Sequence, residues 1–210
     1  MRKNILLETF HSLWYKSCLL FSWIIALCFF RFRVYGRKNV PDGGGALIAA
    51  NHQSYFDPPF VSVGTVLRPV HFLARQELFE VNWFFKTLIS SLYTIPLERR
   101  TYDSQGLRTA IHVLKKGGLL LIFPEGGRSW NGELRLPKKG LTLIARKANV
   151  PIIPALIEGS YQAWPRRKTL PWRFYPIKIK YGSPIRVDPS VSPEQAVNMI
   201  YQSWKDLKSV

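Results

Sequence analysis

The sequence predicts a layered α/β domain in which a mostly parallel or mixed central sheet is flanked by helices. Two observations support this prediction. Short apolar runs of strand length recur along the chain, and helical patterns lie between them. Several of the runs are apolar throughout, as expected for strands that are covered on both faces. The chain has 210 residues, which fit one such domain with a short appended segment.

An apolar segment precedes this domain. Residues 18–30 carry no charge, Lys16 precedes them, and Arg31 and Arg33 follow. The run is shorter than the roughly 20 residues of a spanning helix, and no small-residue cleavage site follows it. We expect a helix lying in the cytoplasmic leaflet of the cell membrane, with a single span and a buried core helix as alternatives. Residues 1–34 are thus expected to form a hydrophobic membrane anchor, and residues 35–210 the folded domain.

A turn at residues 41–45, which contains three glycines, separates the anchor from the first strand. The last strand-length run, IKIKY, alternates between apolar and charged residues and is therefore predicted to lie at a sheet edge. The expected strands are residues 46–50, 70–74, 94–97, 119–123, 152–156 and 177–181.

Three helices are predicted between and after these strands. The first is capped by Asp103 or Ser104 and ends at Gly117, and the second covers residues 137–148. The third begins with Ser192-Pro193-Glu194-Gln195, the pattern of a capping box.

The net charge of +17 predicts an anionic partner: nucleic acid, an anionic membrane surface or a phosphorylated substrate. The cations are spread along the chain and form no block of five, which disfavours nucleic acid. The two cysteines, Cys18 and Cys28, exclude a disulfide framework and a cysteine-rich metal site. No His/Asp/Glu cluster has the spacing of metal ligands, so neither a metal nor another cofactor is expected.

His52 directly follows an apolar strand, at the position where α/β sheets bind ligands. Asp57 lies five residues further on and precedes two prolines, which suit the start of a helix. A carboxylate bonded to one imidazole nitrogen fixes the tautomer and leaves the other nitrogen free as a base. On spacing alone, a histidine paired with an acid for structural reasons is an equal alternative.

A second group of polar residues follows the strand 119–123. Glu125, Gly126, Gly127 and Arg128 form a loop in which the glycines allow close backbone approach and the guanidinium can bind phosphate. The alternative is a turn with a solvated Glu–Arg pair. A third segment, residues 94–100, is a strand that ends in two cations, Arg99 and Arg100, and solvated surface charges are an equal alternative. A fourth, residues 150–154, is bracketed by prolines and is interpreted as structural.

Together these four segments resemble the glycerophospholipid acyltransferases, most closely the bacterial 1-acyl-sn-glycerol-3-phosphate (lysophosphatidate) acyltransferases. The sequence NHQSYFDP resembles the His-x4-Asp block of that family, and IPLER, FPEGGRS and VPIIP resemble its next three blocks in the same order. The segment from Ala74 to Phe79 is also similar, with Arg75 where the family usually has Lys. Gly127 stands where the family usually has Thr.

The resemblance implies an acyltransferase domain that converts lysophosphatidate to phosphatidate in phospholipid synthesis. His52 would be the general base and Asp57 would hold its ring. Arg99, the loop from Glu125 to Arg128, and Arg75 would bind the phosphate of the acceptor. The implied partners are a lysophospholipid acceptor, acyl-CoA or acyl carrier protein as donor, and an anionic membrane surface. Nucleic acid is not an expected partner.

Two alternatives stay open at this stage. In the first alternative, the acceptor is another lysolipid, such as a lyso-ornithine lipid, because basic residues accept any anionic headgroup. Alternatively, the chain is a non-enzymatic basic module that binds membranes or nucleic acid. The basic cluster Arg166-Arg167-Lys168 after Trp164 faces lipid, the phosphates of the donor, or only solvent.

Overall fold

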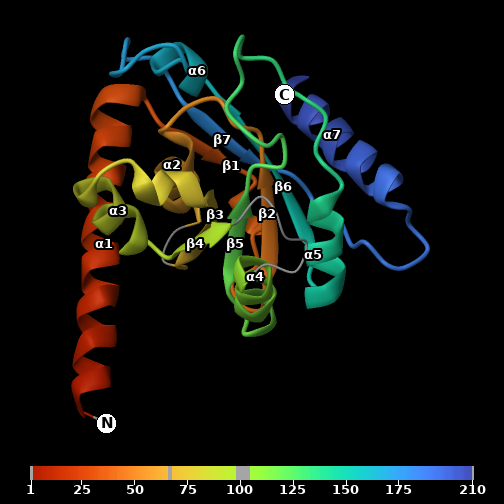
Figure 1. Cartoon of the computed structure of the whole chain (residues 1–210). Coiled ribbons are helices and arrows are strands. Elements are labelled where there is room, and N and C mark those ends of the chain that lie inside the picture. Colours follow the sequence, from red (N-terminus) through yellow and green to blue (C-terminus); the bar gives the residue numbers. More distant parts are fainter. Residues whose placement is uncertain (1, 66–67, 98–104, 210) are drawn as a thin grey trace.

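The computed structural model describes residues 2–65, 68–97 and 105–209 and confirms the α/β class. Seven strands form one mixed sheet in the order β1-β7-β6-β2-β5-β3-β4 (Figure 1). Within the described residues, all neighbouring strands run parallel except β6 and β7. The strands are β1 Arg33–Tyr35, β2 Ala46–Ala50, β3 Val70–Arg75, β4 Thr94–Leu97, β5 Leu119–Ile122, β6 Ile152–Glu158 and β7 Lys178–Tyr181.

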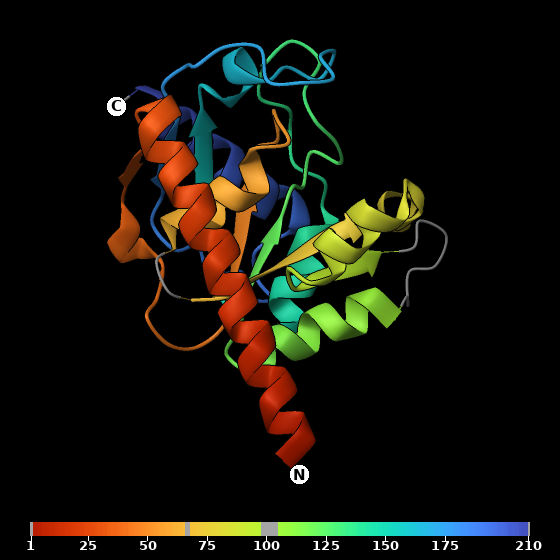
Figure 2. The ribbon, with the colours of Figure 1, turned by 90° about the vertical axis from the view of Figure 1, so that its left-hand side faces the viewer.

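Helices cover both faces of this sheet. One face packs against α1 and α2, and the other against α4, α5 and α7 (Figures 1 and 2). The helices are α1 Arg2–Phe30, α2 Asp57–Gly64, α3 Trp83–Ser90, α4 Gln105–Lys115, α5 Gly140–Ala148, α6 Ser160–Ala163 and α7 Pro193–Ser209, with 3-10 turns at Arg37–Asn39 and Gln76–Glu80.

Two hydrophobic cores form because side chains alternate across each strand. In β2, Ile48 packs into the core beneath α1 and α2, whereas Leu47 and Ala49 face α4, α5 and α7. Trp204 of α7 is fully buried in the second core, and its indole N–H donates to the carbonyl oxygen of Ala49 across 3.1 Å. The central strands β2 and β5 are buried throughout, which explains their uninterrupted apolar sequences.

All six predicted strands form, but the prediction that IKIKY is an edge strand is wrong. The strand β7 lies between β1 and β6. The three-residue β1, which the apolar pattern did not reveal, forms the edge on that side of the sheet. The alternating lysine of β7 does not face solvent. Lys180 is 7% exposed, and its Nζ lies 2.8 Å from Oε2 of Glu158 and donates to the carbonyl of Leu207 across 2.7 Å.

The three predicted helices correspond to α4, α5 and α7. The helix expected from residue 137 begins at Gly140, and the expected caps Asp103 and Ser104 of α4 lie outside the described residues. The capping box of α7 is confirmed. The hydroxyl of Ser192 accepts from the main-chain N–H of Gln195 across 3.1 Å, and Oε1 of Gln195 accepts from the N–H of Ser192 across 2.7 Å.

The helix α1 runs along the outside of the domain (Figure 2). Its stretch Ser12–Phe30 has a mean hydropathy of 1.7 and is long and apolar enough to cross a membrane. Only 17% of that stretch is buried, which disfavours a core helix. Ala26 and Phe30 pack into the domain, and the apolar side chains that face outward include Leu20, Phe21, Trp23, Ile24, Leu27 and Phe29. The expected boundary after residue 34 falls within β1 and stays a prediction.

Candidate active site

The predicted site residues converge at the carboxyl ends of three adjacent parallel strands. His52 follows β2, the loop at residues 123–129 follows β5, and Arg75 ends β3. These strands are neighbours in the order β2-β5-β3, so their ends lie at one edge of the sheet, where α/β folds bind ligands. Arg99 follows β4, the next strand in that order, but lies outside the described residues.

The His52–Asp57 pair forms as predicted from the sequence. Nδ1 of His52 lies 2.8 Å from Oδ2 of Asp57, and Asp57 is fully buried at the start of α2. The same oxygen accepts from the main-chain N–H groups of Gln53 and Ser54, across 2.6 and 2.7 Å. The turn that connects β2 to α2 therefore fixes the carboxylate before it meets the ring.

This geometry sets the tautomer of the imidazole. Because Oδ2 of Asp57 acts as an acceptor toward two main-chain donors, the ring nitrogen facing it carries the proton and donates. The lone pair of Nε2 is then free to take a proton. The ring of Phe123 stacks on the imidazole with centroids 4.0 Å apart and planes 17° apart, which fixes the ring plane. The side chain of His52 is 17% exposed.

Main-chain bonds fasten the His52 turn to the 123–129 loop. The N–H of Ser129 donates to the carbonyl oxygen of His52 across 2.7 Å, and the N–H of His52 donates to Oε1 of Glu125 across 3.3 Å. On the other side, the amide of Asn51 makes two hydrogen bonds to the main chain of Ile157 in β6. The histidine is thus held between two neighbouring strands.

The carboxylate of Glu125 serves this internal framework. Its side chain is 1% exposed, and its second oxygen accepts from Nε of Arg135 across 3.1 Å. Burial raises the pKa of Glu125 to about 7, although the hydrogen bond and charge of Arg135 act in the opposite direction. Glu125 therefore links the backbone of the histidine to a guanidinium group.

Three guanidinium groups, including that of Arg135, bind main-chain carbonyls of the same loop. Arg75 donates to the carbonyl of Gly126, Arg135 to that of Gly127, and Arg166 to that of Arg128, the last across 2.8 Å. Gly126 has a φ of +79°, a left-handed conformation that favours glycine. A loop held by this much positive charge is suited to an anionic ligand.

Arg128 has unused binding capacity. Its guanidinium lies over the ring of Tyr55, 3.6 Å from the centroid. Its Nη1 is buried and has no hydrogen-bond partner within the described chain. Burial lowers the pKa of Arg128, with the nearby charge of Arg166 acting in the same direction. Because a buried unpaired donor is costly, this N–H is the atom best placed to receive a phosphate oxygen.

The structure thus brings together His52, Asp57, Arg75 and all four residues of the loop Glu125–Arg128. Sequence reasoning missed Arg135, Asn51 and the stacking role of Phe123. Arg135 reaches the loop because the chain reverses after Ser129, whose hydroxyl accepts from the N–H of Gly132 across 3.0 Å. The only sequence signal for this reversal is the Asn-Gly pair at residues 131–132.

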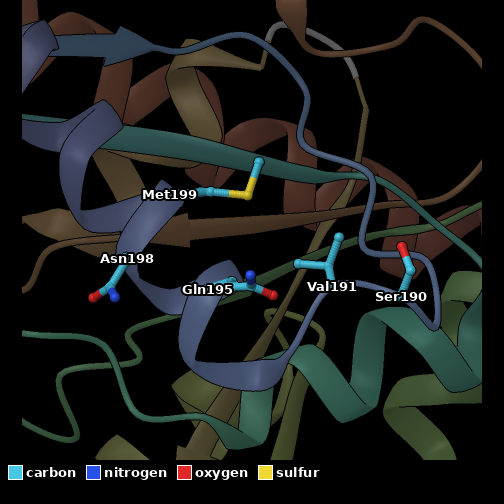
Figure 3. A pocket seen from close by; sticks show the side chains of 5 residues that line it. All are labelled: Ser190, Val191, Gln195, Asn198 and Met199. Atoms are coloured by element: carbon cyan, nitrogen blue, oxygen red, sulfur yellow. The ribbon is translucent and has the colours of Figure 1, made fainter.

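Apart from these strand ends, a hollow of about 500 Å³ lies beside the first turns of α7, and Figure 3 shows the side chains that line it. All the side chains that line it are uncharged, so it offers neither a base nor a cation. They are Ser190, Val191, Gln195, Asn198 and Met199. This hollow is therefore a weaker candidate for a catalytic site than the strand ends that carry His52 and the 123–129 loop.

Comparison with known proteins identifies relatives of this chain. A 1-acyl-sn-glycerol-3-phosphate acyltransferase of Bacillus subtilis is 30% identical over 127 residues, covering 60% of this chain and 62% of that protein. A protein of the same name from Limnanthes alba is 34% identical over 154 residues, covering 68% of this chain and 51% of that protein. The chain therefore spans less than two thirds of the length of these relatives.

A solved structure shows the same fold over nearly the whole chain. It is the crystal structure of the 1-acyl-sn-glycerophosphate (LPA) acyltransferase PlsC from Thermotoga maritima. It superposes with a TM-score of 0.78 and 27% sequence identity, and the match covers 96% of this chain and 81% of that one. The family model described as Acyltransferase matches residues 31–158, a span that holds His52, Asp57 and the 123–129 loop. With more than half of its residues inside that match, the chain belongs to the Acyltransferase family.

Proposed function

We propose that this chain transfers a fatty acyl group from an acyl thioester to the free hydroxyl of lysophosphatidate, giving phosphatidate. The observation that carries the proposal is the contact of 2.8 Å between His52 and a buried Asp57, next to a loop lined with cations. The names of the relatives from Bacillus subtilis and Thermotoga maritima support the same substrate.

In the proposed reaction, Nε2 of His52 takes the proton of the acceptor hydroxyl as its oxygen attacks the thioester carbonyl. The imidazolium that forms is stabilised by Asp57. When the tetrahedral intermediate collapses, the C–S bond breaks and the imidazolium returns its proton to the departing thiolate. No covalent bond to the enzyme forms. A positioned general base of this kind accelerates a reaction by about 10²–10⁴-fold.

The acceptor phosphate is proposed to bind at the 123–129 loop. Arg128 supplies the free buried N–H, and Arg75 supplies a second guanidinium from β3. The resemblance adds Arg99 to these phosphate-binding residues. The main chain of Gly126 and Gly127 forms the rest of the proposed phosphate site. Glu125 contributes indirectly, because both of its oxygens are bonded within the protein and hold Arg135 beside the loop.

We propose the cytoplasmic face of the cell membrane as the place of action, with residues 1–34 as the anchor. The exposed apolar face of α1 supports this location. The donor is acyl-CoA or acyl carrier protein, both of which carry the thioester and a phosphate-bearing arm. The net charge of +17 suits both the donor and an anionic membrane.

A transfer assay with purified protein tests the proposal. Lysophosphatidate is offered with acyl-CoA and, separately, with acyl carrier protein, and phosphatidate is quantified. We expect product with the native chain and a rate lower by about 10²–10⁴-fold with His52→Ala. A panel with lyso-ornithine lipid and other lysophospholipids tests the acceptor: faster turnover of one of these would replace lysophosphatidate. Absence of transfer to every acceptor would favour the non-enzymatic membrane-binding module.

A further inference from the structure

The loop after α6 exposes an unusual combination of side chains. Residues 167–176 are all exposed, and no acidic residue occurs between residues 164 and 176. Four large apolar side chains project from this loop: Leu170 is 73% exposed, Trp172 56%, Phe174 74% and Tyr175 43%. Its cations are Arg166, Arg167, Lys168 and Arg173. We call residues 164–176 the aromatic loop.

The loop that exposes these side chains is held in place by hydrogen bonds. The main-chain N–H of Trp172 donates to the carbonyl of Ala163 across 2.8 Å, and the indole N–H of Trp164 donates to the carbonyl of Lys168 across 3.0 Å. The ammonium group of Lys168 lies over the ring of Trp172, 3.8 Å from its centroid. A fixed cluster of exposed apolar side chains usually marks an interaction surface.

The aromatic loop is continuous with the exposed face of α1. The ring of Phe174 stacks on Phe29 with centroids 5.1 Å apart, and the N–H of Ile177 donates to the carbonyl of Phe30 across 2.8 Å. In both views of the ribbon, the end of α1 and the segment after α6 lie side by side (Figures 1 and 2). The apolar side chains of the two elements therefore form one surface.

The loop also touches the candidate active site. Arg166 donates to the carbonyl of Arg128 across 2.8 Å, and its guanidinium lies over the ring of Trp130 at 3.8 Å. Tyr55, which packs beneath Arg128, contacts Trp164 with ring centroids 5.2 Å apart. A ligand that covers the loop is thus adjacent to the residues proposed to bind the acceptor.

We propose that the aromatic loop is a second membrane-contact element, which seats on an anionic bilayer beside α1. Exposed Trp and Tyr side chains favour the headgroup level of a bilayer, and neighbouring cations are attracted to its anionic lipids. The loop carries both kinds of side chain and no acid, which matches a lipid surface more closely than the mixed charges of a protein partner. The inference rests on the proposed function, since it places the membrane at the entrance for a lipid acceptor.

A spin-label measurement tests this contact without requiring turnover. A nitroxide is attached at Thr169→Cys, in a chain whose Cys18 and Cys28 are changed to Ser, and the protein is reconstituted into vesicles of phosphatidylcholine and phosphatidylglycerol. The matched control label is Gln202→Cys on α7, which covers the opposite face of the sheet. Accessibility to oxygen, which concentrates in lipid, is compared with accessibility to a water-soluble nickel complex.

We expect the oxygen-to-nickel ratio at residue 169 to exceed that at residue 202 several-fold. Trp172→Ser with Phe174→Ser should return the ratio to the control value, whereas Leu143→Ser with Met199→Ser, two exposed apolar positions on α5 and α7, should leave it unchanged. A label at residue 169 that is as accessible to nickel as the label at residue 202 would overturn the proposal.

Two further experiments identify the ligand that the cations of the aromatic loop recognise. Arg167→Gln with Lys168→Gln should reduce the ratio at residue 169 in vesicles with phosphatidylglycerol to the value in pure phosphatidylcholine. Coenzyme A is also added to the detergent-solubilised protein. Immobilisation of the label by coenzyme A, without any response to vesicles, would make the loop a donor site and refute membrane contact. Lipid contact in a chain without transferase activity would retain this inference and remove the proposed function.

Discussion

The main-chain N–H of Ser129 donates to the carbonyl oxygen of His52 across 2.7 Å, although the two residues follow different strands. This bond joins the turn that carries the proposed base to the loop that carries the proposed phosphate ligands. Together with the bond from the N–H of His52 to Glu125, it makes the two loops one unit. Reacting groups held in a fixed relative position need little reorganisation during the reaction, which is the basis of catalysis by orientation.

The first prediction concerns the pair His52–Asp57. We expect His52→Ala and Asp57→Asn to lower kcat by about 10²–10⁴-fold, because the first removes the base and the second disturbs its tautomer and the charge that stabilises it. His112→Ala, at an exposed position on α4, is the matched control and should keep native activity. Initial rates at saturating substrate measure the effect, and near-native turnover of either site variant would remove the pair from the mechanism.

The second prediction compares two adjacent glycines of the 123–129 loop. At Gly126, φ is +79°, which strains any residue that has a Cβ, so Gly126→Ala should lower the free energy of unfolding by about 1–3 kcal/mol. At Gly127, an added Cβ would lie 3.4 Å from Nη2 of Arg75, which is an ordinary contact. Gly127→Ala should therefore change the free energy of unfolding by less than about 0.5 kcal/mol. Urea unfolding in mild detergent measures both, and equal losses would contradict this loop geometry.

The central strands and the site histidine were predictable because local sequence determines them. The strands β2 and β5 are apolar runs with turns on either side, and the pairing of His52 with Asp57 needs only the short turn between them. The strand β1 was not predictable, because the three residues from Arg33 to Tyr35 have no strand pattern of their own and pair with β7, far along the chain. The edge-strand prediction for IKIKY failed for a related reason: the partner of Lys180, Glu158, belongs to another strand.

The contribution of Arg135 likewise depends on tertiary structure. Nothing in its neighbouring sequence marks it as a partner of Glu125, ten positions earlier. The two meet because the intervening turn, held by the hydroxyl of Ser129 and the side chain of Asn131, reverses the chain. Residues of this kind become visible only when the fold is known.

The third prediction concerns recognition of the acceptor phosphate. Removal of a hydrogen bond to a charged group costs about 1.5–3 kcal/mol, so Arg128→Gln should raise KM for lysophosphatidate by about 10–100-fold while kcat changes much less. Arg186→Gln, an exposed arginine outside the site, is the control. The same assay with a monoacylglycerol, which lacks the phosphate, should show no such rise in KM. Equal rises for both acceptors would remove Arg128 from the phosphate site.

The fourth prediction concerns α1. Leu20, Phe21 and Ile24 are between 46% and 65% exposed, so changing all three to Gln should release protein from vesicles without unfolding it. Sedimentation with vesicles measures the release, and Leu143→Gln with Met199→Gln on the far face is the control. These substitutions test membrane binding more specifically than deletion of residues 1–34, because the deletion would also remove buried Phe30 and part of β1. Undiminished sedimentation of the triple variant would refute α1 as the anchor.

The fifth prediction concerns the buried carboxyl of Glu125, whose pKa is raised from 4.5 to about 7 by burial. Between these values the folded chain binds more protons than the unfolded chain, so the free energy of unfolding decreases as pH rises. From pH 5 to pH 8 this group alone should remove about 2 kcal/mol of stability.

Glu125→Gln isolates this contribution, because glutamine does not titrate but keeps an oxygen that accepts from the N–H of His52. We expect the stability of the variant relative to the native chain to improve by about 2 kcal/mol between pH 5 and pH 8. The exposed Glu133→Gln is the control and should show no such trend. Urea unfolding at each pH gives the difference. Parallel stability profiles for the native chain and Glu125→Gln would mean that Arg135 keeps the carboxylate ionised throughout, so that the ion pair outweighs burial.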